Sequence, residues 1–468
     1  MSIMKRILIY MLVVTVAAFA ISCGVANNNR VVEQNRIVVL DPGHFHAGLL
    51  QMHRVEGMCD TVSVYAPEGP ELGGYLYNIN YYNNRKHDPT QWVVEQYVGD
   101  DFLEKMLQEK RGNTVVISGN NKKKTRYIYE SINAGYNVLA DKPMAISTED
   151  FALLEKAYEL AEDKGLILYE LMTERYDIYN IVEKALLHNK DVFGELQKGT
   201  KDEPAVYMES VHYFCRLSSS GKASSRPAWY YDVEQQGEGI ADVTTHLIDL
   251  VQWSCFPDKS IRYGKDVVLT DAEHWPTLVT LEEYAQSTRT ETFPEYLQKD
   301  INEEGVLEVM ANGTLAFEMN GVNVGIKVTW PYLTPQGGSG TSQSIKRGSR
   351  ATLEILQSAE TDYKKNFYVV RNDGVDAEKF DAALQKAIAD LNGEEPYITL
   401  TAETDGRYLV EFSQESRSSH ENHFGLVAES YFRYIKAGKA PRWERDNALS
   451  KYWITTEGVA LAKSKDKE

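Results

Sequence analysis

The sequence predicts an α/β protein with two parts: a doubly wound parallel sheet near the N-terminus, then an α+β domain with a mostly antiparallel open sheet. Two patterns support this. Short apolar runs, typical of strands buried on both faces, alternate with helical segments between residues 36 and 169. Beyond about residue 205, longer half-buried strands follow one another without helical crossovers, which favours antiparallel pairing.

The elements of the parallel sheet each have a local signal. A short helix is expected to begin at Leu49, after the turn that follows the first strand. Ser147 and Asp150 form a capping pair before a longer helix, and Gly165 ends that helix. The predicted strands are residues 36–40, 61–65, 114–118, 137–140 and 166–169, with another helix over 124–134.

The second half of the chain has the strand period of two. Apolar residues alternate over 313–330 on either side of Asn320-Gly321, a dipeptide typical of a hairpin turn. Further strands are predicted at 206–211 and 351–356, and a late helix at 421–437 ends at Gly438.

The first residues are typical of a lipoprotein signal. Lys5 and Arg6 precede an apolar run over 7–21, which is shorter than the roughly 20 residues of a membrane span. Cys23 follows small residues at the expected cleavage point, as in a bacterial lipobox, so it is the predicted lipidation site. We expect an exported, membrane-anchored lipoprotein of the periplasm or cell envelope.

These signals divide the chain into four parts. Residues 1–22 are the signal peptide and 23–34 a tether; 35–147 form a Rossmann-like dinucleotide-binding domain, and 148–468 a domain for substrate binding and oligomerisation. We expect a homo-oligomer. The formal net charge of −18 repels phosphate backbones and excludes nucleic acid as an expected partner. It leaves the lipid anchor as the only expected membrane contact.

Two segments carry candidate catalytic residues. Asp141-Lys142-Pro143 follows a predicted parallel strand, and ligands of open α/β sheets lie at the carboxyl ends of strands. A lysine there can polarise a substrate oxygen. The segment 239–250 is predicted to be one helix, with Asp242 and His246 four residues apart on its polar face, an arrangement suited to acid/base chemistry.

The first turn, Asp41 to Gly48, departs from the Gly-x-Gly-x-x-Gly pattern of dinucleotide-binding folds. Gly43 matches the middle glycine, while Asp41 and His46 stand at the other two positions. Asp41 would bring negative charge toward a pyrophosphate. A helix N-terminus near Phe45, or protonated His44 or His46, could offset that charge.

The chain resembles the Gfo/Idh/MocA family of sugar oxidoreductases, and specifically an exported Bacteroidetes-type lipoprotein branch with a divergent oxidoreductase C-terminal domain. Asp141-Lys142-Pro143 matches the family's Glu-Lys-Pro motif, which supplies a catalytic Lys. Gly237, Asp242 and His246 match its later acid/base helix, with Glu238 in place of a second glycine.

The resemblance also implies a cofactor site. Its predicted residues are Gly43, His44, Phe45, His46, Asn120, Asn121, Lys142, Pro143 and Arg175. Arg175 either contacts the nicotinamide side or forms a structural salt bridge. The implied cofactor is NAD, weakly favoured over NADP by Glu68 after the second strand, and the altered glycine pattern leaves the absence of any nucleotide open.

The leading hypothesis is an NAD(P)-dependent oxidoreductase of a sugar or sugar derivative, in which Lys142 polarises the oxygen and His246 takes the hydroxyl proton. Three alternatives stay open. They are a redox-neutral NAD-dependent glycosidase or lyase on the same fold, a non-catalytic sugar-binding lipoprotein, and a metal hydrolase using the His-x-His of His44 and His46. The leading hypothesis assigns no metal ligand.

Overall fold

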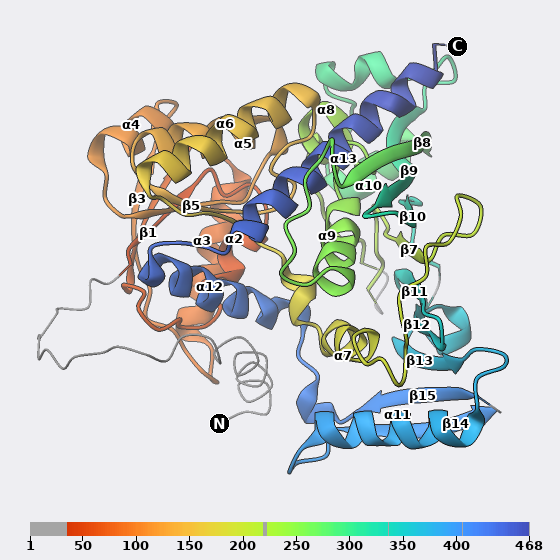
Figure 1. Ribbon diagram of the computed structural model, residues 1–468. Coiled ribbons are helices and arrows are strands. Elements are labelled where there is room, and N and C mark those ends of the chain that lie inside the picture. Colours follow the sequence, from red (N-terminus) through yellow and green to blue (C-terminus); the bar gives the residue numbers. More distant parts are fainter. Residues whose placement is uncertain (1–34, 219–221, 336, 405, 468) are drawn as a thin grey trace, which may run out of the picture.

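The computed structural model describes residues 35–218, 222–335, 337–404 and 406–467. Cys23, the predicted signal peptide and the tether lie outside the described residues. The described chain forms two sheets side by side, a parallel sheet wrapped in helices and a larger, mostly antiparallel sheet (Figure 1). The predicted fold class is confirmed.

The first sheet has six parallel strands in the order β3-β2-β1-β4-β5-β6, which is the doubly wound arrangement. Val39 of β1 lies beside Val64 of β2 and Val116 of β4, and all three are buried. The strands are β1 (Ile37–Leu40), β2 (Thr61–Ala66), β3 (Val93–Val98), β4 (Thr114–Ile117), β5 (Asn137–Ala140) and β6 (Leu168–Glu170).

The sequence did not predict β3, and its position explains why. It is an edge strand with most of its side chains at least partly exposed, so it lacks the apolar run that marks its neighbours. Its exposed residues include Glu95, which pairs with Arg36. Charged residues on an edge strand protect it from pairing with other chains.

Five helices accompany this sheet: α2 (His46–Leu49), α3 (Pro70–Asn84), α4 (Phe102–Glu109), α5 (Asn121–Asn133) and α6 (Thr148–Lys164). The hydroxyl of Ser147 accepts a hydrogen bond from the Asp150 amide, and Gly165 ends α6 in the left-handed conformation, as predicted. Because β6 pairs with β5, the parallel sheet continues past residue 147, where the sequence placed the domain boundary.

The C-terminal helices return to the first domain. They are α12 (His420–Ala437) and α13 (Arg442–Lys465). Phe424, Val427 and Tyr431 of α12 belong to the same apolar core as Val39 of β1, and Tyr452 of α13 lies in the core of the other face. Figure 1 shows α12 beside α2 and α3, and α13 crossing from this sheet toward the second one. The first domain is therefore built from both ends of the described chain.

The second sheet has nine strands in the order β14-β15-β13-β12-β11-β7-β10-β9-β8, and only β7 and β10 pair in parallel. Asn320 and Gly321 both have positive φ and join β9 to β10, as a tight hairpin turn requires. The strands are β7 (Val206–Val211), β8 (Val267–Val279), β9 (Leu307–Met319), β10 (Val322–Thr329), β11 (Thr341–Arg347), β12 (Ala351–Gln357), β13 (Asn366–Arg371), β14 (Ile398–Thr404) and β15 (Arg407–Phe412).

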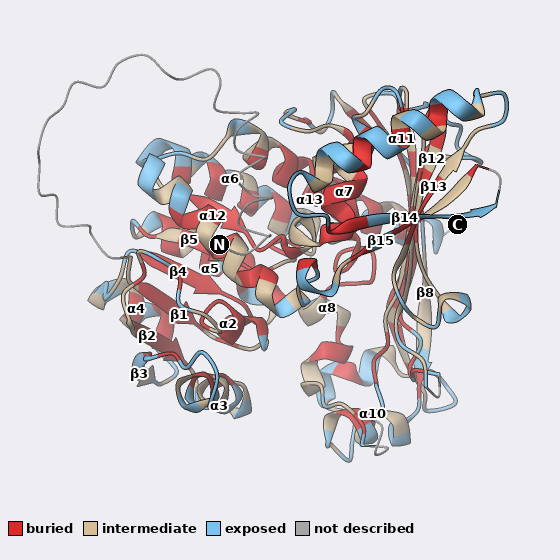
Figure 2. Ribbon diagram, turned by 90° about the horizontal axis from the view of Figure 1, so that it is seen from below, coloured by how far each residue is buried: buried red, intermediate tan, exposed pale blue. Residues whose placement is uncertain are grey.

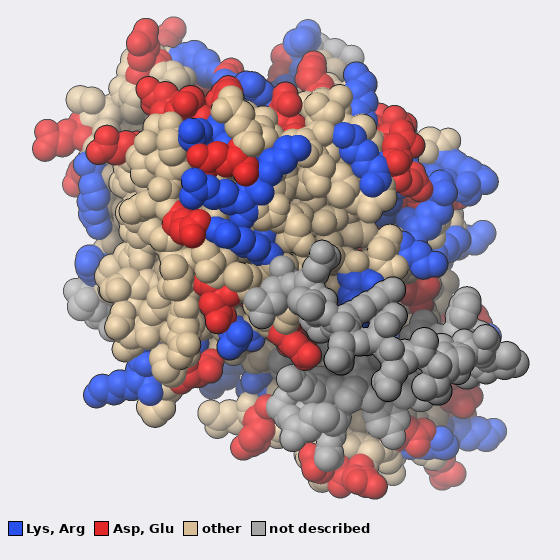
Figure 3. Space-filling view, turned by 90° about the vertical axis from the view of Figure 1, so that its left-hand side faces the viewer, with Lys and Arg blue, Asp and Glu red and all other residues tan. Residues whose placement is uncertain are grey.

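The helices of this half cover one face of the second sheet, which Figure 2 shows edge-on with buried residues toward the helices. They are α7 (Ile178–Leu187), α8 (Val233–Gln236), α9 (Thr244–Cys255), α10 (Leu281–Thr288) and α11 (Ala377–Asn392). Within the described ranges, no helix is long and apolar enough to span a membrane. On the face of the molecule in Figure 3, acidic and basic side chains are interspersed.

Candidate functional site

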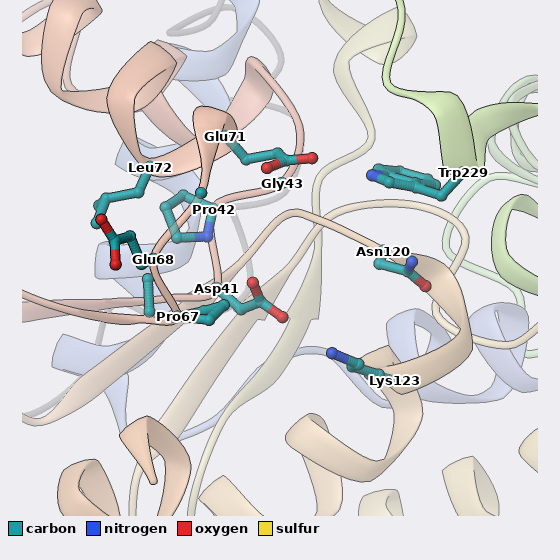
Figure 4. A pocket seen from close by; sticks show the side chains of 12 residues that line it. Asp41, Pro42, Gly43, Pro67, Glu68, Glu71, Leu72, Asn120, Lys123 and Trp229 are labelled. Atoms are coloured by element: carbon teal, nitrogen blue, oxygen red, sulfur yellow. The ribbon is translucent and has the colours of Figure 1, made fainter. Parts of the chain in front are cut away.

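A cavity of about 160 Å³ lies at the carboxyl ends of β1, β2 and β4. This is the edge at which doubly wound sheets bind ligands. Figure 4 shows Trp229 reaching toward this cavity from the second domain, opposite the turns of the first. The lining residues are Asp41, Pro42, Gly43, Ala66, Pro67, Glu68, Gly69, Glu71, Leu72, Asn120, Lys123 and Trp229.

Asp41 faces this cavity. Its φ of 46° places it in the left-handed region, which aspartate tolerates better than most residues. The Tyr127 hydroxyl donates to its Oδ2 at 3.0 Å, and Figure 4 shows the carboxylate turned toward Lys123. Burial raises the pKa of Asp41, while Lys123 and Tyr127 partly oppose that rise. The negative charge predicted at the first turn is therefore present and partly balanced.

The first turn is not a phosphate-binding helix terminus. The helix α2 has only four residues, and the amides of Gly43 and His44 before it have partners within the protein. The His44 amide donates to the Ser118 carbonyl at 3.2 Å, and the Gly43 amide to the Asp41 carbonyl at 2.8 Å. A Cβ on Gly43 would lie 3.2 Å from the Gly119 Cα, so this glycine permits two turns to pack closely. The predicted helix beginning at Leu49 is wrong, because α2 ends there.

The two histidines of this turn face the protein interior. His46 is buried, with Nδ1 3.0 Å from Asp141 Oδ2, and His44 Nδ1 lies 3.5 Å from the same oxygen. Phe45 between them is exposed. Burial lowers the pKa of both imidazoles. Protonated His44 or His46, considered above as a positive contact for phosphate, is therefore not supported.

Lys142 lies at the end of β5 and forms an ion pair with Asp242 of the second domain. Its Nζ is 2.5 Å from Asp242 Oδ1, and Gln236 Nε2 donates to the other carboxylate oxygen at 3.1 Å. Burial lowers the pKa of Lys142, but Asp242, Tyr230 and Asp141 together outweigh this effect and leave the pKa raised. The ammonium group therefore stays charged. The peptide bond from Lys142 to Pro143 is cis.

The predicted helix over 239–250 begins later than expected. Gly239 donates its amide to Met310 of β9, and a Cβ there would overlap the Ala311 carbonyl oxygen, so this segment lies flat against the strand. The helix α9 consequently begins at Thr244. Asp242 lies in the turn before it, so Asp242 and His246 do not share a helical face. The proximity of Asp242 to Lys142 comes from the tertiary fold.

His246 lies in the first turn of α9. Its Nδ1 is buried and has no hydrogen-bond partner among the described residues. Burial, followed by the charge of Lys142, lowers the pKa of His246 well below its usual range. A neutral imidazole with a free nitrogen can accept a proton.

Asn120 and Asn121 connect the two domains. The Asn120 side chain caps α5 by accepting from the Lys122 amide and donates its amide to Gln235 Oε1 at 2.8 Å. Asn121 donates to the Gln236 carbonyl at 2.6 Å. Asn120 lines the cavity, whereas Asn121 is buried in the domain contact.

Arg175 lies in a buried ion-pair network. It makes two hydrogen bonds of 2.6 Å to Asp249 and pairs with Glu444 of α13 at 2.9 Å. Lys451 also contacts Asp249, at 3.1 Å. Of the two roles considered for Arg175, the structure supports the salt bridge, because these carboxylates occupy its guanidinium.

Two further residues near Lys142 were not identified from the sequence. His212 follows β7, stacks on Trp330 with ring centroids 4.8 Å apart, and contacts the Ser210 hydroxyl at 2.8 Å. Burial, with a contribution from the charge of Lys142, lowers the pKa of His212 to about 3. Tyr230, which contacts the same Trp330, lies close enough to raise the pKa of Lys142. The sequence signal that could have identified His212 is its position directly after the predicted strand 206–211.

Comparison with known proteins assigns the chain to a family. Residues 182–463 match the family described as "Putative oxidoreductase C terminal domain". No curated protein matches the chain. A crystal structure of a "putative oxidoreductase" from Parabacteroides merdae is 43% identical, with a TM-score of 0.90, covering 92% of this chain and 98% of that one.

More distant solved structures share the fold. The 3-ketoreductase KijD10 from Actinomadura kijaniata, in complex with NADP, is 12% identical with a TM-score of 0.52, covering 92% of this chain and 97% of that one. The myo-inositol 2-dehydrogenase from Lactobacillus plantarum is 14% identical with a TM-score of 0.52, and the match covers 92% of this chain and 98% of that one. The predicted Gfo/Idh/MocA-type architecture is confirmed, and the chain belongs to the oxidoreductase family defined by this C-terminal domain.

Proposed function

We propose that this protein is a nicotinamide-nucleotide-dependent oxidoreductase of a sugar or sugar derivative. One observation carries the proposal: Lys142, which lies at the end of β5 and pairs with Asp242, is close enough to His246 and His212 for its positive charge to lower the pKa of both imidazoles. Proteins of the same fold include a 3-ketoreductase in complex with NADP and a myo-inositol 2-dehydrogenase.

The cavity suits the adenosine end of NAD. Glu68 and Glu71 follow β2, where carboxylates of dinucleotide-binding folds accept hydrogen bonds from ribose hydroxyls. Lys123 is the one cation among the residues that line the cavity, and it offers a positive charge to phosphate. Asp41 and the internally bonded first turn oppose the pyrophosphate, so we expect weaker binding than a glycine-rich turn gives. The bound nicotinamide would accept or donate hydride.

The residues of the chain would handle the proton and the oxygen. Lys142 donates a charge-assisted hydrogen bond to the reacting oxygen and stabilises negative charge on it. Asp242 keeps Lys142 protonated and holds its ammonium group in place. His246, whose pKa is lowered so that it is neutral, accepts the hydroxyl proton.

A redox-neutral lyase or glycosidase is a second candidate, supported by the presence of two neutral histidines near Lys142. Elimination needs a base for the C–H proton in addition to a base for the hydroxyl, and His212 could serve as the additional one. Such a reaction would consume no nucleotide overall. Product analysis under limiting nucleotide separates the two, because an oxidoreductase stops after forming one equivalent of product per equivalent of nucleotide supplied, whereas a redox-neutral enzyme continues.

Nucleotide binding tests the proposal. We expect calorimetry to show NAD binding at least about tenfold more tightly than NADP, because Glu68 and Glu71 repel a 2′-phosphate. Glu68→Ala should narrow this difference, whereas Glu378→Ala, an exposed change on α11, should not. If neither nucleotide binds the wild type, and denatured protein releases none, the proposal is wrong.

The pH profile of kcat/KM should have a plateau from about pH 6 to 9. A base must be unprotonated, and His246 and His212 both have pKa values below the usual 6.5, so the acid limb should lie below that value. Below about pH 6.5 the two histidines are protonated in the unfolded chain but stay neutral in the folded one. The free energy of unfolding therefore also falls as the pH falls below this value. Circular dichroism over the same range separates unfolding from loss of catalysis. An acid limb above pH 7 would contradict the assignment.

We also propose that the protein is exported and lipidated on Cys23, from its charged start, its apolar run and the small residues before the cysteine. Cys23→Ala should abolish labelling with palmitate in cells. Continued labelling of that variant would disprove lipidation at this site.

A further inference from the structure

The first turn and the end of β5 bring together three potential metal ligands. His44, His46 and Asp141 each offer one ligand atom, and these atoms all lie within 4.8 Å of one another. We infer that these three side chains bind a divalent transition-metal ion of the zinc class. The inference concerns a site beside the proposed nucleotide cavity and does not depend on the proposed reaction.

The distances between the ligand atoms fit one ion. Asp141 Oδ2 lies 3.0 Å from His46 Nδ1 and 3.5 Å from His44 Nδ1. Two ligands bound at about 2.0–2.1 Å in a tetrahedral site lie roughly 3.3 Å apart. The observed separations lie on either side of this value, so an ion can bind with small side-chain adjustments. Imidazole and carboxylate together suit zinc, iron or nickel better than calcium or magnesium.

Neighbouring groups hold the ligands in position. The Ser118 hydroxyl donates to Asp141 Oδ2 at 2.8 Å, and the His46 ring packs against Phe424 with centroids 4.7 Å apart. Supporting contacts of this kind orient the ligands in metal sites. The three ligand side chains are at most 27% exposed, so water competes weakly for them.

Two lysines and a histidine lie near the same region, and the charges of the two lysines reduce the affinity for a cation. Lys124 directs its Nζ to Asn121 Oδ1 at 2.6 Å, and Lys142 directs its Nζ to Asp242. His420 lies near His46, with ring centroids 6.0 Å apart, and contacts the Thr173 hydroxyl. Both ammonium groups therefore point to other partners, and they leave the ligand atoms accessible.

Three protein ligands leave at least one coordination position for water or a substrate oxygen. The ion would also place positive charge on the turn in which Asp41 brings a negative charge to the cavity. It would give a role to the His-x-His that replaces part of the glycine pattern.

The test uses metal-stripped full-length protein in detergent, without nucleotide or sugar. Calorimetry with Zn²⁺ should show one equivalent bound per chain, and Co²⁺ should give visible d–d bands. His44→Ala and His46→Ala should each weaken Zn²⁺ binding by at least about tenfold, on the scale of lost ligand or supporting groups. His53→Ala, at a partly exposed histidine that pairs with Asp88 outside the proposed site, is the matched control and should bind as the wild type does.

X-ray absorption on the wild-type, Zn²⁺-loaded protein tests the site without any variant, so the test does not depend on the variants folding. Two imidazoles and one carboxylate in the first coordination shell would support the site. Wild-type binding no tighter than that of His44→Ala/His46→Ala, or a coordination shell without imidazole, would overturn it. Because no nucleotide is present, failure here leaves the proposed oxidoreductase function untouched.

Discussion

Replacing Lys142 by Met is expected to lower turnover by at least about 10²-fold, the usual scale for a lost electrostatic or acid/base group. The side chain lies at the end of β5, is paired with Asp242 and remains charged at neutral pH. Methionine keeps most of the volume of the side chain and removes the ammonium group. Steady-state kinetics with a sugar substrate and saturating NAD measures the effect.

The same change has a cost in stability. The pair is 14% and 5% exposed, so Lys142→Met leaves the Asp242 carboxylate buried without its partner, which costs roughly 3–5 kcal/mol in fully buried pairs and less here. Lys142→Met/Asp242→Asn should recover stability but not turnover. Lys122→Met, which loses an exposed pair with Glu234, is the control and should change neither. Full activity of Lys142→Met at matched folded fraction would remove Lys142 from the mechanism.

Replacing Arg175 by Met is expected to lower the free energy of unfolding by roughly 3–5 kcal/mol, the scale for breaking a buried ion pair. Asp249 and Glu444 would lose their guanidinium partner, and both are buried. Because Lys451 still contacts Asp249, the lower end of this range is expected. Urea unfolding measures the change.

The folded fraction of Arg175→Met should keep the KM for the nucleotide close to that of the wild type, since the guanidinium is occupied by carboxylates. Arg433→Met, an exposed position on α12, is the control for stability. A raised KM for the nucleotide with unchanged stability would reverse this interpretation and make Arg175 a cofactor contact.

The sequence predicts the two sheets well because the signals are local. The strands β1, β4 and β5 are short apolar runs, and the hairpin at Asn320-Gly321 has a turn signal of its own. Helix boundaries were less accurate where tertiary contacts override propensity. Gly239 lies against β9 and delays α9, and the packing of the Gly43 turn on Gly119 accompanies the shortened α2.

The site was predicted in part. Motif position identified Lys142 and Asp242, and the structure brings them into contact. The shared helical face proposed for Asp242 and His246 does not exist, and the role of His212 required knowing that β7 ends near Lys142. The link of Asp141 to His44 and His46 spans some 95 residues of sequence, so no local pattern could indicate it.

The return of α12 to the parallel sheet affects the order in which the protein can fold. Phe424, Val427 and Tyr431 complete the apolar layer over β1, and a chain emerging from the ribosome makes them long after residues 37–170. Until then only α2 and α3 cover part of that face of the sheet, and contacts of such sequence separation form slowly. A fragment ending before His420 would contain every strand of both sheets and still lack the C-terminal helices that complete the core of the first domain. The two domains therefore cannot be separated by a single cut in the chain between them.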